Sequence, residues 1–367
     1  METVTPMTLS DQRPWLFQVY PELKEKIPFC SLGEYPSPVE PLRRLGEKLG
    51  AEIWIKRDDI ASCVYGGNKC RMMEWIIPDA HKKKRKSLVT WGALGSNQVL
   101  SSVIYGTRDG FDDITAVYNR QPYQPYVKRN FLIATALGVK QKFAGNSFTY
   151  LARLAGTYFG KLLSGKRPYL IPLLGSSPLS VLAYANAALE LKRQIDAGEC
   201  PRPDFVYVTV GTGGTFAGLL LGSLLFGDIG KIVGVRILEP VFVNRPMVAW
   251  EVNRTLGFLK SMGVDTGRAR IRPRDINLVS GYMGAGYAEK TPEAEESLRL
   301  LDESENITLD ITYTAKTMAA LMDHAARNPG SRYLFWHTLN TVALGDYTAK
   351  LPGVDEVPRC FQNELKQ

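Results

Sequence analysis

The sequence predicts an α/β protein of two domains, with parallel-type sheets covered by helices in three αβα layers. Apolar strand segments alternate along the chain with helical segments, a pattern typical of parallel sheets that are buried on both faces. The chain has 367 residues and is 45% hydrophobic, so it is long enough for two domains with sizeable cores.

One unit recurs along the chain: an apolar strand, a turn of small residues and a helix. It predicts strands at 51–59, 88–93, 114–119, 205–210, 231–240 and 331–337. Helices are expected after the strands at 88–93, 205–210 and 331–337. Ligands of such folds bind at the carboxyl ends of the strands, which is where these turns lie. The sequence therefore predicts a site built from turns that are far apart in the chain.

The charge pattern and the hydropathy bear on two classes of partner, nucleic acids and membranes, and neither is expected. The formal net charge is +8, and HKKKRKS at 81–87 is basic enough to suggest nucleic-acid binding. This cluster directly precedes an apolar strand, so we interpret it as a solvated helix end whose cations suit the negative end of the helix dipole. The longest apolar run, at 218–226, is well short of the ~18 residues of a membrane span. The first twenty residues lack the features of a secretory signal, so we expect a cytoplasmic protein with neither a nucleic-acid nor a membrane partner.

The cysteines and histidines do not form metal or disulfide motifs. Five cysteines are widely spaced without a CxxC pair, which argues against a disulfide framework and a zinc knuckle. The chain has three histidines, His81, His324 and His337, and no HExxH motif. We therefore expect no metal site.

Residues 211–215, with the sequence GTGGT, follow a buried strand and begin a helix. Their backbone N–H groups and threonine hydroxyls would converge at the positive end of a helix dipole, as in a phosphate-binding loop. A glycine-rich turn made only for tight packing is the alternative. A Walker loop is excluded because Phe216 and Ala217 follow Thr215, where a lysine and a hydroxyl residue are required. A dinucleotide fingerprint lacks its last glycine, but Glu239 imitates the ribose-binding acid of that fold, so a nicotinamide cofactor stays open.

Ser96, Asn97 and Gln98 follow a second strand and should project from a helix start into the same crevice. A plain N-cap role for Ser96 or Asn97 is the alternative. The preceding turn does not match the GxSxG nucleophile elbow, and no histidine or acid is placed to complete a catalytic triad.

Lys69 follows two glycines and Asn68 at the start of an amphipathic segment. The positive end of a helix dipole repels an ammonium group, and apolar surroundings also disfavour the charged form. A neutral lysine amine can form a Schiff base. Combined with a phosphate-binding loop elsewhere, it indicates pyridoxal 5'-phosphate, whose aldehyde and phosphate lie at opposite ends of a small ring.

Several motifs together resemble the D-cysteine desulfhydrase and 1-aminocyclopropane-1-carboxylate deaminase family. They are KRDD at 56–59, GGNKCR at 66–71, SNQ at 96–98, GTGGT at 211–215, GAGYAEKTPEA at 284–294, DITYTAK at 310–316 and HT at 337–338. The resemblance covers residues 30–345. It implies the tryptophan synthase beta-like fold (fold type II) of pyridoxal-phosphate enzymes, with a large cofactor domain of residues 1–71 and 186–367 and a small domain inserted at 72–185. It also implies a homodimer.

The resemblance implies a role for each matching residue. Lys69 would form the Schiff base and shuttle the Cα proton, with Asn68 beside it at the cofactor. Asn97 would hydrogen-bond the ring hydroxyl, and Ser96 and Gln98 would lie near the substrate carboxylate and the proton-transfer face. The phosphate would be held by Gly211, Thr212, Gly213, Gly214 and Thr215.

Three further positions bear on the reaction. Tyr287 and Tyr313 look like active-site tyrosines that contact the substrate or tune proton transfer, with ordinary packing as the alternative. At Thr314 the cyclopropane deaminases have a glutamate, which keeps the pyridine nitrogen protonated. A hydroxyl lacks that opposing charge and holds the proton less well. Threonine resembles the D-cysteine desulfhydrase branch.

We therefore expect a lyase that catalyses α,β-elimination of a β-substituted, D-configured amino acid such as D-cysteine, yielding a 2-oxo acid and ammonia. Leu339 and Asn340 replace two glycines of the family's HTGG turn, and CRMMEW replaces its usual helix start, so the substrate need not be cysteine. An amino-acid racemase, a β-replacement enzyme and a cyclopropane deaminase would share the same residues. A nicotinamide oxidoreductase and a non-catalytic pyridoxal-phosphate binding protein are the alternatives of other classes.

Overall fold

The computed structural model describes residues 12–145, 147–172 and 177–366. The predictions for the first twenty residues and for the ends of the large domain therefore fall partly on residues 1–11 and 367, which lie outside the described residues. Part of the predicted small domain, at 146 and 173–176, lies outside them as well.

The larger sheet has six strands in the order β1-β2-β10-β7-β8-β9. They are β1 Val39–Pro41, β2 Glu52–Arg57, β7 Phe205–Val210, β8 Lys231–Arg236, β9 Asn277–Val279 and β10 Arg332–His337. Pairing is parallel except between β1 and β2. β2 pairs with β10 along its whole length, so the two ends of the chain meet in one sheet.

The smaller sheet has four parallel strands in the order β5-β4-β3-β6. They are β3 Ser87–Ala93, β4 Ile114–Asn119, β5 Lys140–Ala144 and β6 Pro168–Leu170. The buried, β-branched runs of β3 and β4 suit a sheet that is covered on both faces. Every predicted strand is present, which confirms the α/β class with parallel-rich sheets.

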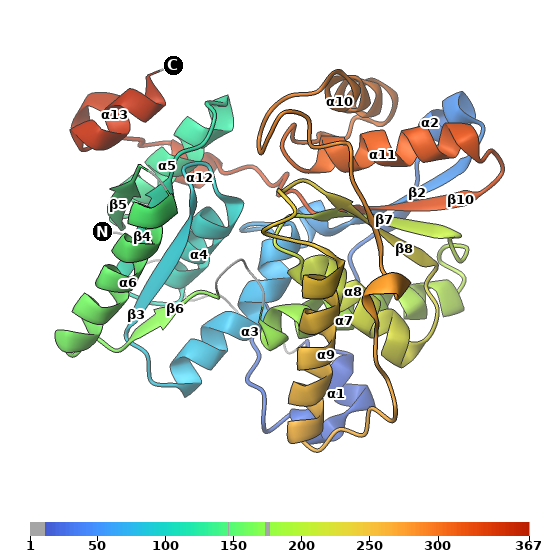
Figure 1. Cartoon of the computed structure of the whole chain (residues 1–367), viewed down its shortest axis with the longest axis horizontal. Helices are drawn as coiled ribbons and strands as arrows, with labels where there is room; N and C mark the ends of the chain where they lie inside the picture. The colour runs from blue at the N-terminus through green and yellow to red at the C-terminus, as the bar shows by residue number, and fades with distance from the viewer. Residues whose placement is uncertain (1–11, 146, 173–176, 367) are drawn as a thin grey trace.

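Helices cover both faces of each sheet (Figure 1). On the larger sheet, α2 Arg43–Leu49, α10 Pro292–Glu305 and α11 Thr314–Arg327 lie on one side, and α7 Pro178–Asp196, α8 Gly214–Phe226 and α9 Arg245–Ser261 lie on the other. The smaller sheet carries α4 Asn97–Arg108, α5 Pro125–Ala136 and α6 Ser147–Leu163. α1 Leu16–Val19 packs against α7, and α3 Asn68–Lys82 lies between the two sheets and contacts both α4 and α7.

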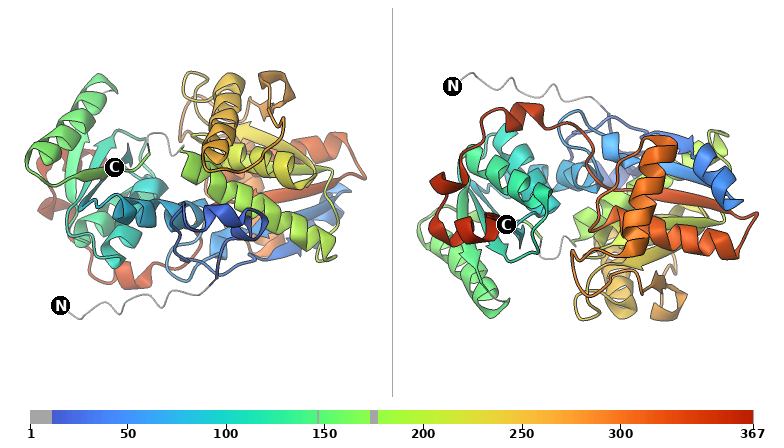
Figure 2. Two further views of the ribbon diagram at one scale, coloured as in Figure 1. Left: turned by 90° about the horizontal axis from the view of Figure 1, so that it is seen from below. Right: turned by 90° about the horizontal axis from the view of Figure 1, so that it is seen from above.

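The C-terminal segment returns to the smaller sheet, as both views of Figure 2 show. It forms α12 Gly345–Thr348 and α13 Arg359–Leu365. The Phe361 ring of α13 packs 4.6 Å from Phe131 and 5.5 Å from Phe143, measured between centroids. The sequence pattern did not predict this return, because it depends on contacts between residues more than two hundred positions apart. The predicted limits of the inserted domain, 72 and 185, fall inside α3 and α7, and they stay a prediction.

No helix among residues 12–145, 147–172 and 177–366 has both the length and the apolar character that crossing a membrane requires.

Candidate active site

A cavity of about 720 Å³ opens between the two sheets at the carboxyl ends of their parallel strands. It is lined by the turns after β3, β4, β7, β8 and β10, together with the start of α3. All the residues that the sequence assigns to a site lie in its wall. They are Asn68, Lys69, Ser96, Asn97, Gln98, Gly211, Thr212, Gly213, Gly214, Thr215, Tyr287, Tyr313 and Thr314.

The two glycines before Asn68 allow the chain to reach the start of α3. Gly67 has φ +75°, and a Cβ added there would lie 2.6 Å from the Thr338 carbonyl oxygen. Its N–H donates to the Asp58 carbonyl oxygen at 2.7 Å, and the Asn68 N–H donates to the Thr338 carbonyl oxygen at 3.1 Å. Only glycine fits so close to the backbone after β10 in this conformation. Lys69 is therefore held by main-chain contacts to two strand ends.

The Lys69 amine has little to stabilise a positive charge. Burial lowers its pKa from the ordinary 10.5 to about 8. Among the described residues its nitrogen has a single polar contact, the Met72 sulfur at 4.0 Å, and a thioether is a weak acceptor. A substantial fraction of this amine is neutral near physiological pH, so Lys69 can act as a nucleophile.

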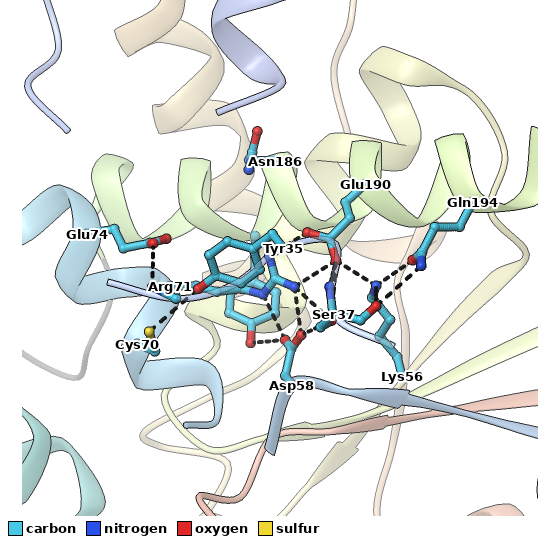
Figure 3. A network of polar contacts seen from close by, with 12 residues as sticks. Tyr35, Ser37, Lys56, Asp58, Cys70, Arg71, Glu74, Asn186, Glu190 and Gln194 are labelled. Atoms are coloured by element: carbon cyan, nitrogen blue, oxygen red, sulfur yellow. Dashed lines mark hydrogen bonds and ion pairs between the residues drawn. The ribbon is translucent and has the colours of Figure 1, made fainter. Parts of the chain in front are cut away.

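A buried ionic network holds the first turns of α3 (Figure 3). Arg71, two residues after Lys69, donates to Asp58 through Nε at 3.0 Å and Nη2 at 2.7 Å. It also donates to Glu190 of α7 through Nη1 at 2.8 Å and Nη2 at 2.9 Å. Burial opposes ionisation of Asp58, but the Arg71 guanidinium outweighs it and holds the pKa of Asp58 below its ordinary value. Such bidentate pairing fixes the orientation of the Arg71 guanidinium and also balances the charges of the two carboxylates.

Further groups complete the network around Asp58. Tyr184 and Trp336 donate to Asp58 Oδ2 at 2.8 Å and 2.7 Å. Lys56 of β2 donates to Glu190 Oε1 at 2.6 Å. Each carboxylate thus faces at least one cation, and the network around Arg71 joins β2, β10, α3 and α7.

The glycine-rich turn after β7 forms the second part of the site. Gly213 is the N-cap of α8 with φ +96°, a conformation that favours glycine. The first backbone N–H groups of a helix have no intrahelical partner, so those of α8 are available to an anion at the cavity. Thr215 Oγ1 accepts a hydrogen bond from Asn68 Nδ2 at 3.0 Å, which ties this turn to the residue before Lys69.

The turn after β3 presents the third part. Ser96 is the N-cap of α4, and its Oγ accepts from the Val99 N–H at 3.3 Å. The cap uses the oxygen as an acceptor and leaves the O–H to donate. Gly92 makes room for this arrangement, because a Cβ there would lie 2.5 Å from Ser96 Oγ. The two interpretations of Ser96 therefore do not exclude each other, because this residue caps α4 and also lines the cavity.

The orientation of the Asn97 amide follows from its neighbours. Asn130 Nδ2 donates to the Gly95 carbonyl oxygen at 3.0 Å, and its oxygen accepts from Arg129 at 3.2 Å. The same Nδ2 faces Asn97 Oδ1 at 3.3 Å, and the Tyr65 hydroxyl donates to that oxygen at 3.2 Å. The Asn97 Nδ2 has no partner among the described residues, so it is the donor that the amide offers to the cavity.

Two tyrosines close the wall next to α11. The hydroxyls of Tyr287 and Tyr313 are hydrogen-bonded to each other, and their rings pack edge to face. Burial raises the pKa of Tyr287 to about 12 and the pKa of Tyr313 well above its ordinary value. Both are neutral phenols at physiological pH, so each can donate a hydrogen bond or accept one but carries no charge.

A family model described as "Pyridoxal-phosphate dependent enzyme" matches residues 30–338. The chain belongs to this family. Its cofactor is pyridoxal phosphate, as the sequence predicts.

Individual relatives point the same way. The D-cysteine desulfhydrases of Salmonella paratyphi C (strain RKS4594) and Salmonella newport (strain SL254) are each 31% identical over 329 residues, which is 88% of this chain and 97% of theirs. These matches confirm the resemblance stated from the motifs.

Solved structures share the fold. An ACC deaminase homologue superposes with a TM-score of 0.75 at 27% identity, over 92% of this chain and 99% of the homologue. O-ureido-L-serine synthase has a TM-score of 0.59 at 14% identity, over 90% of this chain and 95% of its own, and at that identity it supports the fold alone.

The residues present fit pyridoxal phosphate. The Lys69 amine, with its lowered pKa and no facing carboxylate among the described residues, suits an aldehyde. The start of α8 at Gly213 suits a phosphate, and the Asn97 amide offers a donor for a ring oxygen. Within the described part of the chain, no cluster of three or more histidine, cysteine or acidic side chains could hold a metal ion.

Several wall residues lack a signal in the sequence. Trp91, Tyr150, Leu238 and Phe242 make much of the wall apolar, but in the sequence they look like ordinary core residues of strands and helices. Leu339, one of the two departures from the family's turn, lines the cavity, whereas Asn340 Oδ1 accepts from the Gly66 N–H at 2.6 Å. Asp310 also lines the cavity, and its position in the DITYTAK motif is the signal that could have revealed it.

Proposed function

We propose that the protein is a pyridoxal-phosphate-dependent lyase that eliminates the β-substituent of a D-amino acid such as D-cysteine. The observation that carries this proposal is the Lys69 amine, with its lowered pKa, in one cavity with the glycine-rich turn of α8. Support for the substrate class comes from the relatives named D-cysteine desulfhydrase. With D-cysteine and water the products are pyruvate, hydrogen sulfide and ammonia.

Each residue has a task in this proposal. Lys69 would hold the cofactor covalently until the substrate amine replaces it there, and the freed Lys69 amine would then accept the proton from the substrate Cα. The C–S bond would break with its electron pair going to the sulfur, which leaves as hydrogen sulfide after taking up a proton. The N–H groups at the start of α8 bind the phosphate, and the Asn97 amide donates to the ring oxygen. Ser96 and Gln98 bind the substrate carboxylate at the start of α4. When bound, the cofactor supplies an electron sink for the charge that forms at Cα.

Tyr287 and Tyr313 form the wall beside the reacting centre. Because both are neutral and hydrogen-bonded to each other, they can hold or pass a proton without leaving a buried charge. We assign them to proton transfer at the leaving group and at the substrate face.

Opening of a cyclopropane ring is the second candidate, favoured by the structural match to an ACC deaminase homologue. A comparison of kcat/KM for D-cysteine, L-cysteine and 1-aminocyclopropane-1-carboxylate separates the candidates. We expect pyruvate from D-cysteine with the highest kcat/KM and little 2-oxobutanoate from the cyclopropane. A higher kcat/KM for the cyclopropane would overturn the elimination proposal. Recovery of L-cysteine from D-cysteine without sulfide would identify a racemase.

The family resemblance also supports a homodimer that works in the cytoplasm. Light scattering coupled to size-exclusion chromatography tests the assembly, with a mass of twice 40.8 kDa expected. A mass of one chain at working concentration would contradict the dimer.

The lowered pKa of Lys69 predicts how covalent loading depends on pH. At pH 7 a lysine with a pKa near 8 is neutral about 300 times more often than one at 10.5. The rate of cofactor loading onto the cofactor-free protein should rise about tenfold per pH unit below pH 8 and level off above it. Stopped-flow absorbance measures this rate, with free Nα-acetyl-lysine as the control. A protein rate that keeps rising to pH 10, as for the free amine, would contradict the lowered pKa.

The same shift has a consequence for stability. Between pH 8 and 10.5 the unfolded chain binds more protons at Lys69 than the folded chain does. Lys69 therefore destabilises the cofactor-free protein below pH 8, and this cost disappears as the pH rises toward 10.5.

A further inference from the structure

Hydrogen bonds with Asp310 determine whether the Thr314 hydroxyl can donate or accept a hydrogen bond in the cavity. Thr314 is the first residue of α11 and is fully buried, and both residues line the cavity. Its Oγ1 donates to Asp310 Oδ1 at 2.7 Å, with the Asp310 carbonyl oxygen as a longer contact at 3.5 Å. The same Oγ1 accepts from the Asp310 N–H at 2.9 Å.

A threonine hydroxyl has one proton to donate and two lone pairs to accept with. The Asp310 carboxylate accepts a hydrogen bond from the hydroxyl proton of Thr314, and the Asp310 N–H donates to one of the two lone pairs. A single lone pair is left, so in this arrangement Thr314 can only accept a hydrogen bond from a group in the cavity.

The backbone partners of Asp310 favour its carboxylate form. Oδ2 accepts from the Thr312 N–H at 3.1 Å and the Tyr313 N–H at 2.9 Å, and Oδ1 accepts from the Thr314 N–H at 3.1 Å. The three backbone N–H groups can only donate, so they favour the carboxylate over the protonated acid, whose O–H would need an acceptor. Burial raises the pKa of Asp310 above its ordinary value, and the hydrogen bonds from Thr314 and from the backbone reduce that rise without reversing it. The start of α11 adds a favourable dipole.

We propose that Asp310 is a positioning residue that makes Thr314 a hydrogen-bond acceptor toward the ring nitrogen of the cofactor, so that this nitrogen carries a proton. The inference rests on the proposed function and on the family resemblance, which implies that Thr314 lies at that nitrogen. A hydroxyl alone holds such a proton less well than a carboxylate does. Here a carboxylate stands one hydrogen bond behind the hydroxyl and polarises it. Asp310 thus does part of what a glutamate does in the cyclopropane deaminases.

Other titratable groups around Asp310 do not replace it. Those that interact with it electrostatically are His337, Lys316, Tyr313, Tyr287, Tyr126 and Tyr65. Burial lowers the pKa of His337, whose Nε2 donates to the Thr308 carbonyl oxygen, and Lys316 donates to the Met283 carbonyl oxygen. Burial raises the pKa of all four tyrosines, which stay neutral. Among these groups Asp310 is the one carboxylate, and it is the group hydrogen-bonded to the Thr314 hydroxyl.

The test reads the ring nitrogen directly. The protein and its variants are loaded with pyridoxal phosphate labelled with ¹⁵N in the ring, and the ¹⁵N chemical shift is followed from mildly acidic to mildly alkaline pH. We expect the shift of a protonated pyridine in the unaltered protein. In Asp310→Asn and Thr314→Val the equilibrium constant for protonating the ring nitrogen should fall by a factor of about ten or more. This lowers the pKa of that nitrogen by about one unit or more. Thr314→Ser keeps the hydroxyl and should retain the proton.

Two outcomes overturn the inference. An unprotonated nitrogen in the unaltered protein removes its basis, and unchanged protonation in both Asp310→Asn and Thr314→Val shows that the pair does not act on the ring. If Asp310→Asn does not fold, as circular dichroism would show, Thr314→Val compared with Thr314→Ser decides, because Asp310 keeps its own side chain and can still accept from the Thr312 and Tyr313 N–H groups in both. Failure of the proposed function is distinguishable, since it would appear as no loading at Lys69 or no product from D-cysteine.

Discussion

Replacing Lys69 with alanine should abolish the visible absorption band of the bound cofactor and lower elimination by roughly 10⁴-fold or more. No other residue described in the cavity wall carries a primary amine, and losing a covalent nucleophile costs several orders of magnitude in rate. Lys69→Arg should behave in the same way, because a guanidinium keeps the positive charge but stays protonated and does not provide the neutral amine.

A matched control for this variant lies on the same helix. Lys82→Ala removes an exposed lysine at the other end of α3, whose Nζ donates to the Lys26 carbonyl oxygen, and it should leave both the band and the rate unchanged. Absorbance and pyruvate release are measured on all three variants. Turnover by Lys69→Ala at the rate of Lys82→Ala would show that the nucleophile is elsewhere.

Replacing Arg71 with methionine should destabilise the fold by about 3–5 kcal/mol, because Asp58 and Glu190 would lose their shared cation while remaining buried. Arg71→Lys should recover only part of this loss, because an ammonium group cannot pair with two carboxylates in the fixed planar geometry of a guanidinium. The free energy of unfolding is measured by urea denaturation of the cofactor-free protein.

The control for Arg71 is an arginine in an exposed pair. Arg327→Ala breaks the surface pair with Asp323 and should change the free energy of unfolding by less than about 1 kcal/mol. Equal effects of the two substitutions would mean that the network around Arg71 contributes no more than an exposed ion pair.

Local motifs explain why much of the site could be predicted. Lys69, the turn at 211–215 and Ser96 each occur where a strand end or a small-residue turn meets a helix start, and that local pattern determines their place at the strand ends. The parallel sheet then brings these turns together in one cavity. The apolar strands were predicted for the same reason, since each is a short buried run with a clear boundary.

The parts that could not be predicted depend on contacts across the chain. The orientation of Asn97 requires Asn130 and Tyr65, which lie on other elements. The network around Arg71 joins Asp58 to Glu190, which lie 132 positions apart in the sequence (190 minus 58), and no local period encodes that pairing. Whether the Thr314 hydroxyl donates or accepts toward the cavity depends on where its single proton points. The position of Asp310 shows that the proton points to Asp310 Oδ1.

The most direct test of the proposed function is the absorbance spectrum of the cofactor-loaded protein before and after D-cysteine is added, with pyruvate and ammonia assayed in the same sample. We predict that a band of covalently bound cofactor is present, that it changes on addition of D-cysteine, and that pyruvate and ammonia appear in equal amounts. A loaded protein whose band is unchanged by D-cysteine and that releases no pyruvate would contradict the assignment of this protein as a D-amino-acid lyase.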